Sequence, residues 1–219
     1  PRLSLQIVCG PTGSGKSRLL QALAAAGAQV LDLERLAAHR GSVLGGLPGQ
    51  PQPTQKAFES RIWDTLRRFD PSRVVFAESE SRRIGRLQVP PALIEAMRAA
   101  PCIALELPAA ARIRLLLQDY AHFVHDPDRL GAQLDGLIAL HGRATIAHWR
   151  QLAQSGALPA LVGELLERHY DPAYRRSIDR NFAGARAAMT LALDDIGDAA
   201  FAAAARRLHE QADTAVEQQ

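Results

Sequence analysis

Several residue types are scarce in this sequence, and each scarcity narrows the class of protein. Of its 219 residues, two are cysteines and only Lys16 and Lys56 are lysines, so arginine supplies 24 of the 26 basic side chains. Two cysteines do not make a disulfide framework. No apolar run reaches the roughly 20 residues that span a bilayer. We therefore expect a reduced, cytoplasmic protein with no membrane partner.

The two cysteines, Cys9 and Cys102, each lie in a short apolar run that is typical of a strand. We expect Cys9 to end one strand and Cys102 to begin another at the opposite edge of a parallel sheet. At about 3.3 Å per residue this places them roughly 15 Å apart. A disulfide would then be excluded by distance, and both side chains are expected in the core.

Composition is otherwise ordinary for a globular protein, with 47% hydrophobic and 22% charged residues. The length allows one well-packed domain. The formal net charge is +3 and the pI is 9.3. The excess of arginine suits phosphate recognition, because a guanidinium can hold a phosphate with two parallel hydrogen bonds. The codon bias of a GC-rich genome gives the same composition, so composition leaves both interpretations open.

A phosphate-binding loop stands near the N-terminus. It matches the pattern G-x-x-x-x-G-K-[ST] between an apolar run (3–9) and a helical pattern (17–26), and consists of Gly10, Pro11, Thr12, Gly13, Ser14, Gly15, Lys16 and Ser17. Its glycines let backbone N–H groups form a nest for phosphate oxygens at the positive end of a helix. Lys16 adds a full charge, and the Ser17 hydroxyl can bind a bridging Mg²⁺. The loop predicts a bound polyphosphate, which could be ATP, GTP or a prenyl diphosphate.

Acidic residues follow the next two predicted strands. Asp32 and Glu34 come just after a strand at 28–31, and Glu78 follows a strand at 73–77. An acid in the position of Glu78 can hold the water shell of a metal ion or orient a nucleophile. Between these strands, the segment 39–53 is rich in glycine and proline and cannot be regular structure. We expect it to be an active-site loop.

The order of predicted elements indicates the fold class. Thr54 is expected to cap a helix over 54–69, another helix covers 90–99, and a strand covers 102–107. Helices then follow over 109–123, 129–140, 143–154 and 159–170, before a strand at 187–193 and a helix at 198–216. The pattern predicts an α/β fold: a P-loop NTPase-like parallel sheet flanked by helices, with a mostly helical segment before the last strand. We expect one domain (1–219), with a core of about 1–108 and 186–219 and a helical insert of about 109–185.

One segment of the helical part interleaves cations and aromatics. It runs over 168–176 and includes Tyr174, Arg175 and Arg176. Such a segment suits RNA, with guanidiniums on phosphates and tyrosines stacked on bases. On the residues alone, a solvated helix end with structural tyrosines explains the segment slightly better. The histidines lack the spacing of zinc ligands, and we assign no zinc.

Several classes of P-loop protein are excluded by missing motifs. The sequence has no [NT]-K-x-D segment to read guanine, no L-S-G-G-Q signature and no helicase motif after Glu78. An ATP-dependent small-molecule kinase remains an alternative, with Arg112 and Arg114 clamping phosphate from a helical lid. A third possibility is an RNA-binding module gated by a nucleotide.

Five segments together resemble one family. They are LDLERLAAHRGSVLGG (31–46), QPTQKAFES (52–60), ESESRRIGRLQVPPAL (78–93), ELPAAAR (106–112) and HYDPAYRRS (169–177). Behind a P-loop, this combination resembles the tRNA 2-selenouridine synthases. Leu44 is a departure, since the family usually has an aromatic residue there.

The resemblance implies a tRNA-modifying transferase. Such an enzyme attaches a geranyl group from geranyl diphosphate to the sulfur of 2-thiouridine at the tRNA wobble position. It then replaces the geranylated sulfur with selenium from selenophosphate. The family also has an N-terminal rhodanese-like domain with a reactive cysteine. No such cysteine loop occurs here and the chain starts abruptly at Pro1, so we expect it to be part of a longer protein.

The resemblance also suggests roles for individual residues. Lys16, Ser17 and Glu78 are expected to be catalytic, because departing pyrophosphate carries negative charge that they and a Mg²⁺ could stabilise. Ser17 and Glu78 are the expected Mg²⁺ ligands. Contacts with pyrophosphate or tRNA are expected from Asp32, His39, Arg40, Ser42, Glu80, Arg82, Arg83, Tyr174, Arg175 and Arg176. The arginines could instead be surface residues paired with neighbouring acids.

Overall fold

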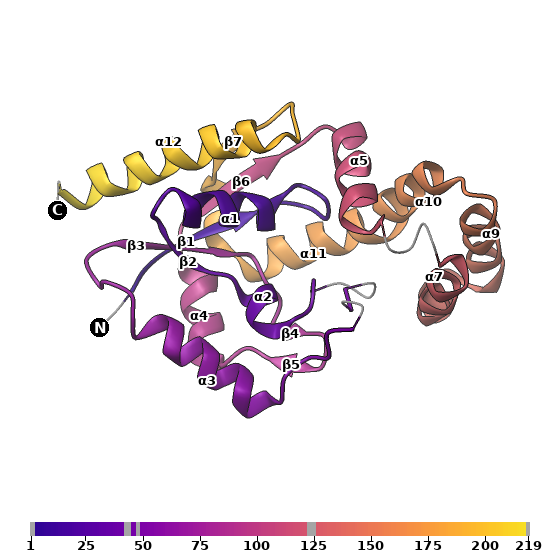
Figure 1. The fold of residues 1–219 in the computed structure, drawn as a ribbon, viewed down its shortest axis with the longest axis horizontal. Coiled ribbons are helices and arrows are strands. Elements are labelled where there is room, and N and C mark those ends of the chain that lie inside the picture. Colours follow the sequence, from indigo (N-terminus) through magenta and orange to yellow (C-terminus); the bar gives the residue numbers. More distant parts are fainter. Residues whose placement is uncertain (1–2, 42–44, 47–48, 122–125, 218–219) are drawn as a thin grey trace.

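A computed structural model describes residues 3–41, 45–46, 49–121 and 126–217 (Figure 1). Ser42 and Leu44, both singled out above, lie outside the described residues. The chain forms an α/β layer around a five-stranded sheet, and a group of helices extends from one end of it. The predicted fold class is confirmed.

The sheet is parallel throughout, in the order β2-β3-β1-β6-β7. Its strands are β1 (Ser4–Cys9), β2 (Gln29–Leu31), β3 (Val74–Glu78), β6 (Cys102–Glu106) and β7 (Met189–Ala192). The chain fills one side of β1 with β2 and β3, then the other side with β6 and β7. The strand order therefore reverses at β1, and in open α/β sheets ligands bind beyond the carboxyl ends of strands at such a point.

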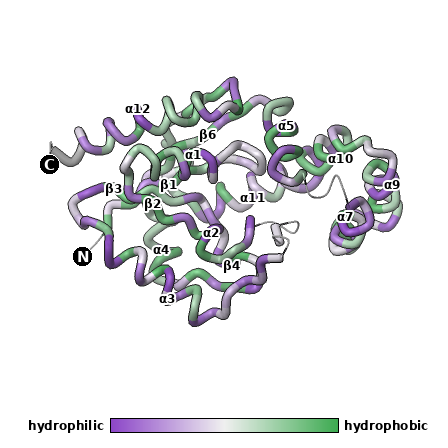
Figure 2. Tube along the Cα trace, in the orientation of Figure 1, coloured by the Kyte–Doolittle hydropathy of each residue, from purple (hydrophilic) through white to green (hydrophobic). Residues whose placement is uncertain are grey.

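Helices cover both faces of the sheet, which explains why its strands are continuous apolar runs. On one face α1 (Lys16–Ala25) packs against α12 (Asp198–Glu217), and their buried side chains form one core with Val8 and Ile103. On the other face a second core includes Phe58 of α3 (Gln55–Leu66) and Met97 of α4 (Pro91–Ala99). Figure 2 shows hydrophobic residues in green along the strands of the sheet and in segments of the helices that cover it.

Local sequence signals account for the short elements around the sheet. The Thr54 hydroxyl accepts a hydrogen bond from the backbone N–H of Ala57 and caps α3, as predicted. The hairpin of β4 (Arg83–Ile84) and β5 (Leu87–Gln88) was not predicted, because two-residue strands are too short to show an alternating pattern.

The helical region has a hydrophobic core of its own, built around the fully buried Trp149. Its elements are α5 (Ala109–Asp119), α7 (Pro127–Leu134), η1 (Asp135–Leu137), α8 (Ile138–His141), α9 (Arg143–Gln154), α10 (Leu158–Leu165), η2 (Leu166–Tyr170), α11 (Asp171–Asn181) and η3 (Ala183–Ala187). The predicted helix over 143–154 is confirmed. The prediction that a helix ends at Tyr170 is wrong. A π turn, η2, leads directly into α11, and Pro172 is tolerated in the first turn of that helix.

The predicted separation of the two cysteines is also wrong. β1 and β6 are neighbouring strands, and Ile7 is the residue of β1 that stands opposite Cys102. Cys9 lies two residues further along β1, so both side chains are on the same face and in the same core. The two thiols are close enough to hydrogen-bond, which together with burial raises the pKa of Cys9. Both cysteines are buried and free, as predicted.

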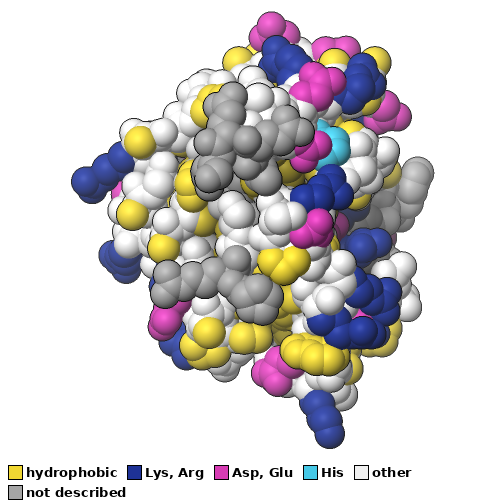
Figure 3. Space-filling model, turned by 90° about the vertical axis from the view of Figure 1, so that its left-hand side faces the viewer, with side chains coloured by type: hydrophobic (Ala, Val, Ile, Leu, Met, Phe, Trp, Pro, Cys, Tyr) yellow, Lys and Arg dark blue, Asp and Glu magenta, His cyan; other side chains and the backbone are white. Residues whose placement is uncertain are grey.

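The end of the molecule that carries both chain termini faces away from the helical region. Figure 3 views that end, where cations and anions are interspersed and the cations gather toward its right-hand edge. Within the described part of the chain, no helix is both long and apolar enough to cross a bilayer.

Candidate active site

The P-loop connects the carboxyl end of β1 to the N-terminus of α1. Gly13 and Gly15 have positive φ angles of 78° and 87°, which other residues rarely adopt. A Cβ at Gly15 would come within 2.5 Å of the Phe201 ring, and a Cβ at Gly13 within 2.9 Å of Leu116. Both glycines are therefore required by backbone angle and by packing. The loop forms one wall of a cavity of about 370 Å³.

Lys16 extends from the first turn of α1 back over its own loop. Its ammonium group donates hydrogen bonds to the carbonyl oxygens of Gly10 (2.8 Å) and Pro11 (3.5 Å). These are neutral acceptors, and no carboxylate in the described part of the chain forms an ion pair with Lys16. A phosphate in the loop would offer a charged acceptor, and charge-assisted hydrogen bonds are the stronger kind.

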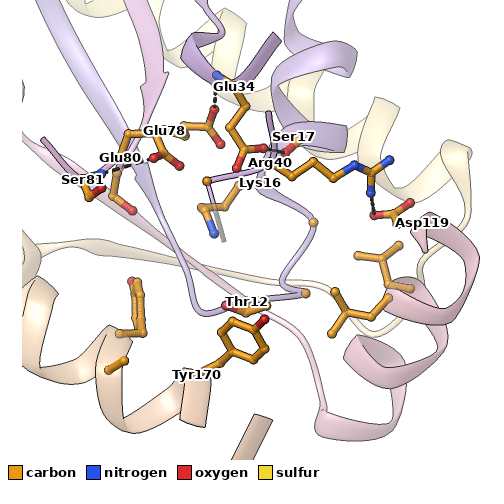
Figure 4. A pocket seen from close by; sticks show the side chains of 18 of the residues that line it. Thr12, Lys16, Ser17, Glu34, Arg40, Glu78, Glu80, Ser81, Asp119 and Tyr170 are labelled. Carbon is orange, nitrogen blue, oxygen red and sulfur yellow. Dashed lines mark hydrogen bonds and ion pairs between the residues drawn. The ribbon is translucent and has the colours of Figure 1, made fainter. Parts of the chain in front are cut away.

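Three glutamates face the P-loop across the cavity: Glu34, Glu78 and Glu80 (Figure 4). Glu78 ends β3, Glu80 follows it by two residues, and Glu34 lies in α2 (Leu33–Ala37) after β2. One carboxylate oxygen of each lies within 4.8 Å of the others. The Ser17 hydroxyl donates to Glu34 at 3.2 Å. The carboxyl ends of two adjacent strands thus bring three acids to the start of α1.

Burial and mutual repulsion act on all three carboxyl groups. Burial, followed by repulsion from Glu80, raises the pKa of Glu34 to about 8. Burial and then the charge of Glu34 raise the pKa of Glu78, which is only 1% exposed. Burial also raises the pKa of Glu80. In this arrangement, a positive charge placed among the acids would relieve the repulsion.

The residues expected to hold Mg²⁺ fit that ion. The Ser17 hydroxyl and the Glu78 carboxylate both border the cavity, and oxygen is the ligand that Mg²⁺ prefers. One oxygen of Glu78, Oε2, is buried and has no hydrogen-bond partner among the described residues. A buried acceptor without a partner is costly, and a cation would satisfy it.

The opposite wall of the cavity comes from the helical region. This wall offers aliphatic and aromatic surface. It comes from Leu115 of α5, Tyr120 just after α5, Tyr170 of η2 and Tyr174 of α11. Tyr170 lies beside Thr12 in Figure 4. Burial raises the pKa of Tyr174, so its hydroxyl stays protonated. The cavity therefore has a charged side and a side that can hold apolar or planar groups.

Two arginines meet one aspartate at the edge of the cavity. Asp119 pairs with Arg18 at 3.0 Å and with Arg40 at 3.7 Å. The Arg40 guanidinium also stacks on the ring of Tyr120, 5.0 Å from its centroid. Arg40 thus lies at the cavity, as the sequence suggested, and it has an acidic partner there.

Arg112 does not have the position of a phosphate clamp. It is 7% exposed, and its Nε and Nη2 donate to the carbonyl oxygen of Thr12 at 2.9 and 2.7 Å. The same guanidinium pairs with Asp171. Arg114 is exposed on α5, away from the residues that line the cavity. The role that the kinase alternative gives to Arg112 is therefore corrected: this arginine braces the P-loop against α11.

Several other candidate residues are not among those that line the cavity. Asp32 caps α2 by accepting a hydrogen bond from the Arg35 N–H at 2.8 Å, so its carboxylate is used in the fold. His39 pairs with Gly46 through a β-bridge, and burial lowers the pKa of its imidazole. Arg83 folds back on its own hairpin and donates to Gly85 O at 2.8 Å. Arg82, Arg175 and Arg176 are exposed.

Glu34 and His169 are among the cavity residues that sequence reasoning did not assign to the site. Glu34 was noted beside Asp32 but not assigned to the site. The structure separates them: Asp32 caps α2, whereas Glu34 accepts a hydrogen bond from the Ser17 hydroxyl. His169 borders the cavity and forms a 3.0 Å hydrogen bond with His141. No spacing pattern could have shown that contact, since the two residues are 28 positions apart.

The fold and the cavity define a P-loop α/β domain in which the P-loop faces a carboxylate cluster. The model of the tRNA 2-selenouridine synthase AAA domain matches residues 3–127, which is more than half of the chain. The chain belongs to this family.

Relatives named tRNA 2-selenouridine synthase extend the match. One from Aeromonas salmonicida is 33% identical over 77% of this chain and 52% of its own length. One from Nitrosomonas eutropha is 40% identical over 53% of this chain and 30% of its own length. The chain thus spans about half or less of these relatives. Among solved structures, TT1252 from Thermus thermophilus aligns over 96% of this chain and 98% of its own with a TM-score of 0.41 and 16% identity, so the fold class rests on the sheet order.

Proposed function

We propose that this chain is the P-loop part of a tRNA-modifying transferase, which binds geranyl diphosphate and tRNA. In this proposal the enzyme attaches a geranyl group to the sulfur of wobble 2-thiouridine, on the way to 2-selenouridine. One observation carries the proposal: a single cavity joins a P-loop, a carboxylate cluster and an aromatic wall in a member of this family. A diphosphate with an apolar tail needs the P-loop for its phosphates and the aromatic wall for its tail.

The chain's residues have defined tasks in the transfer. A bond forms between the thiouridine sulfur and the first carbon of the geranyl group, and the bond from that carbon to the diphosphate oxygen breaks. The electron pair leaves with pyrophosphate, and the N3 proton of the thiouridine is released to water. Backbone N–H groups of the P-loop and the Lys16 ammonium then stabilise the charge that develops on the pyrophosphate. For this, Lys16 exchanges its bonds to Gly10 O and Pro11 O for phosphate oxygens.

A Mg²⁺ held by Ser17 and Glu78 would supply further positive charge to the same diphosphate oxygens. The apolar wall at Leu115 and Tyr174 would receive the geranyl chain and exclude water from the reacting carbon. Exclusion of water matters here because an allylic carbon that loses pyrophosphate also reacts with water.

tRNA would approach along α11. Tyr174 and Ser177 of α11 border the cavity, whereas Arg175 and Arg176 are exposed next to them. Phosphate contacts from these arginines would position the anticodon without reading its sequence. The exchange of sulfur for selenium from selenophosphate is proposed for the whole enzyme, together with an N-terminal rhodanese-like domain. A cytoplasmic location is part of the same proposal.

Product analysis tests this function. A protein that contains this chain and the rest of its natural sequence is incubated with geranyl diphosphate, Mg²⁺ and an anticodon stem–loop containing 2-thiouridine. Nucleosides are then examined by mass spectrometry. We expect S-geranyl-2-thiouridine with the wild type and with Lys56→Ala, an exposed lysine of α3, and at least about a hundredfold less with Lys16→Ala. Equal product from both lysine variants, or ATP hydrolysis with no geranylated nucleoside, would refute the proposal.

A further inference from the structure

The three glutamates of the cavity are closer together than uncompensated acids should be. Oxygens of Glu34, Glu78 and Glu80 all lie within 4.8 Å of one another, and Glu78 and Glu80 are 1% and 8% exposed. Charges of one sign at this distance, with little water between them, repel strongly. We infer that Glu34, Glu78 and Glu80 together bind one divalent cation, and that they do so without any diphosphate.

The cavity's own cations do not neutralise this cluster. Arg18 and Arg40 both pair with Asp119 on the other side of the cavity. The Lys16 ammonium forms its hydrogen bonds with the carbonyl oxygens of Gly10 and Pro11. Among the described residues that line the cavity, no cation forms an ion pair with the three glutamates.

The cluster also has an acceptor that points to a ligand. Oε2 of Glu78 is buried and lacks a hydrogen-bond partner among the described residues, whereas Oε1 accepts a bond from the backbone N–H of Glu34 at 3.4 Å. One carboxylate oxygen is thus positioned by the backbone and the other is left inside the cluster. A buried carboxylate oxygen with no donor is rare in native proteins, and a cation is the simplest group that would satisfy it.

Space for the ion is kept open by Gly41. A Cβ at this position would lie 2.9 Å from Glu34 Oε1 and 3.0 Å from Glu80 Oε1, and the residue has a positive φ of 60°. Any side chain at 41 would therefore press on the two carboxylates. This gives a physical reason for glycine within the HRGS segment, apart from the turn that it makes.

The ligand set indicates the class of ion. Three carboxylates and a nearby hydroxyl, with no histidine or thiol in the cluster, select a hard cation such as Mg²⁺ or Mn²⁺. Three negative charges from the protein give the ion more affinity than the one or two carboxylates with which Mg²⁺ usually depends on substrate phosphates. This inference rests on the proposed function only for the use of the ion, which would meet the diphosphate at Ser17.

The test measures binding of Mn²⁺ alone, by electron paramagnetic resonance and calorimetry, with no diphosphate present. We expect the wild type to bind one Mn²⁺, and Glu34→Gln and Glu80→Gln to bind it at least about tenfold more weakly. Glu95→Gln, a matched change at an exposed residue of α4, should bind it like the wild type. Thermal unfolding provides a second readout: Mn²⁺ should raise the Tm of wild type and Glu95→Gln, and raise that of Glu80→Gln much less.

Folding of the variants can be checked in the same series. Because Glu80→Gln removes repulsion, the variant without metal should unfold at no lower temperature than the wild type. A wild type that binds no Mn²⁺ up to about 1 mM would overturn the inference, as would glutamine variants that bind it normally. The variant Lys16→Ala distinguishes this site from the proposed function. It should still bind Mn²⁺ but no longer bind geranyl diphosphate. If Mn²⁺ binds but geranyl diphosphate does not, the function fails and the cation site stands.

Discussion

Arg112 and Asp171 form a two-point ion pair, with Nη1 at 3.0 Å from Oδ2 and Nη2 at 2.6 Å from Oδ1. The residues are 59 positions apart and join α5 to the first turn of α11. Because the same guanidinium also donates to Thr12 O, the pair connects the shape of the P-loop to the wall that carries Tyr170 and Tyr174.

Removing this arginine should loosen the loop and destabilise the fold. We expect Arg112→Met to lower the free energy of unfolding by about 3 kcal/mol, because it leaves the Asp171 carboxylate without its partner. Diphosphate affinity should fall as well. The double variant Arg112→Met with Asp171→Asn should recover part of the stability, since the unpaired charge is gone. Urea unfolding measures the stability of the single and double variants. A double variant that is as unstable as the sum of the single variants would contradict this role of the pair.

A P-loop glycine and a glycine outside the loop allow the cost of packing to be separated from the cost of backbone strain. Gly15 and Gly156 both have positive φ angles, 87° and 73°, but only Gly15 has neighbouring atoms where a Cβ would lie. Gly156→Ala should cost about 1 kcal/mol, the strain alone. Gly15→Ala should cost about 2–4 kcal/mol because the Phe201 ring must also move.

Binding separates these two glycine variants further. Isothermal titration with pyrophosphate should show normal affinity for Gly156→Ala and a large loss for Gly15→Ala. Equal unfolding midpoints for the two variants would show that the contact between Gly15 and Phe201 does not constrain the loop.

The hydrogen bonds of Glu164 should make the stability of the helical region depend on pH. Glu164 accepts hydrogen bonds from Trp149 Nε1 and from His148 Nε2, both at 2.9 Å, and the bond from His148 is the largest cause of its lowered pKa. A carboxyl group whose pKa is lower in the folded state stabilises the fold above its unfolded pKa. That contribution is lost as the pH falls through the folded value.

We therefore expect Glu164→Gln to destabilise the helical region by about 1 kcal/mol at pH 7 and by much less at about pH 3. Trp149 fluorescence during urea unfolding reports this region, with the exposed Trp63 replaced by phenylalanine in both proteins. A difference between the two proteins that is the same at both pH values would show that the carboxylate charge contributes nothing.

We predict that the exposed arginines of α11 contact the phosphates of tRNA. Arg175→Ala together with Arg176→Ala should weaken tRNA binding and make the salt dependence of the binding constant less steep, by about one unit of slope for each lost phosphate contact. Arg206→Ala with Arg207→Ala is the matched control, an adjacent exposed pair on α12. Filter binding at several salt concentrations measures both. An unchanged slope for the α11 variant would place the tRNA elsewhere.

Local signals predicted most of the fold. Thr54 and the spacing of Phe58 and Ile62 are enough to place α3, and the P-loop motif requires a strand before it and a helix after it. These features are contained within one turn or one strand, where a chain has few alternatives. The parallel arrangement of the sheet follows from the alternation of such elements, but the strand order does not.

Features that depend on register or on distant contacts could not be predicted in this way. The placement of Cys102 opposite Ile7 depends on where β6 begins relative to β1, and the apolar run of each strand is compatible with several offsets. The bond from Arg112 to Thr12 crosses 100 positions. In the site, Asp32 and Glu34 are chemically equivalent in the sequence. The contact of Glu34 with Ser17, 17 positions away in the sequence, shows which of them lies at the P-loop.

Calorimetry with geranyl diphosphate tests the central claim most directly. Geranyl diphosphate and ATP are titrated separately, with Mg²⁺, into the wild type, Lys16→Ala and Lys56→Ala. We predict that the wild type and Lys56→Ala prefer geranyl diphosphate, and that Lys16→Ala weakens its binding by about ten- to a hundredfold, as expected for one charged hydrogen bond. Preference for ATP in the wild type, or geranyl diphosphate binding that does not depend on Lys16, would contradict the account.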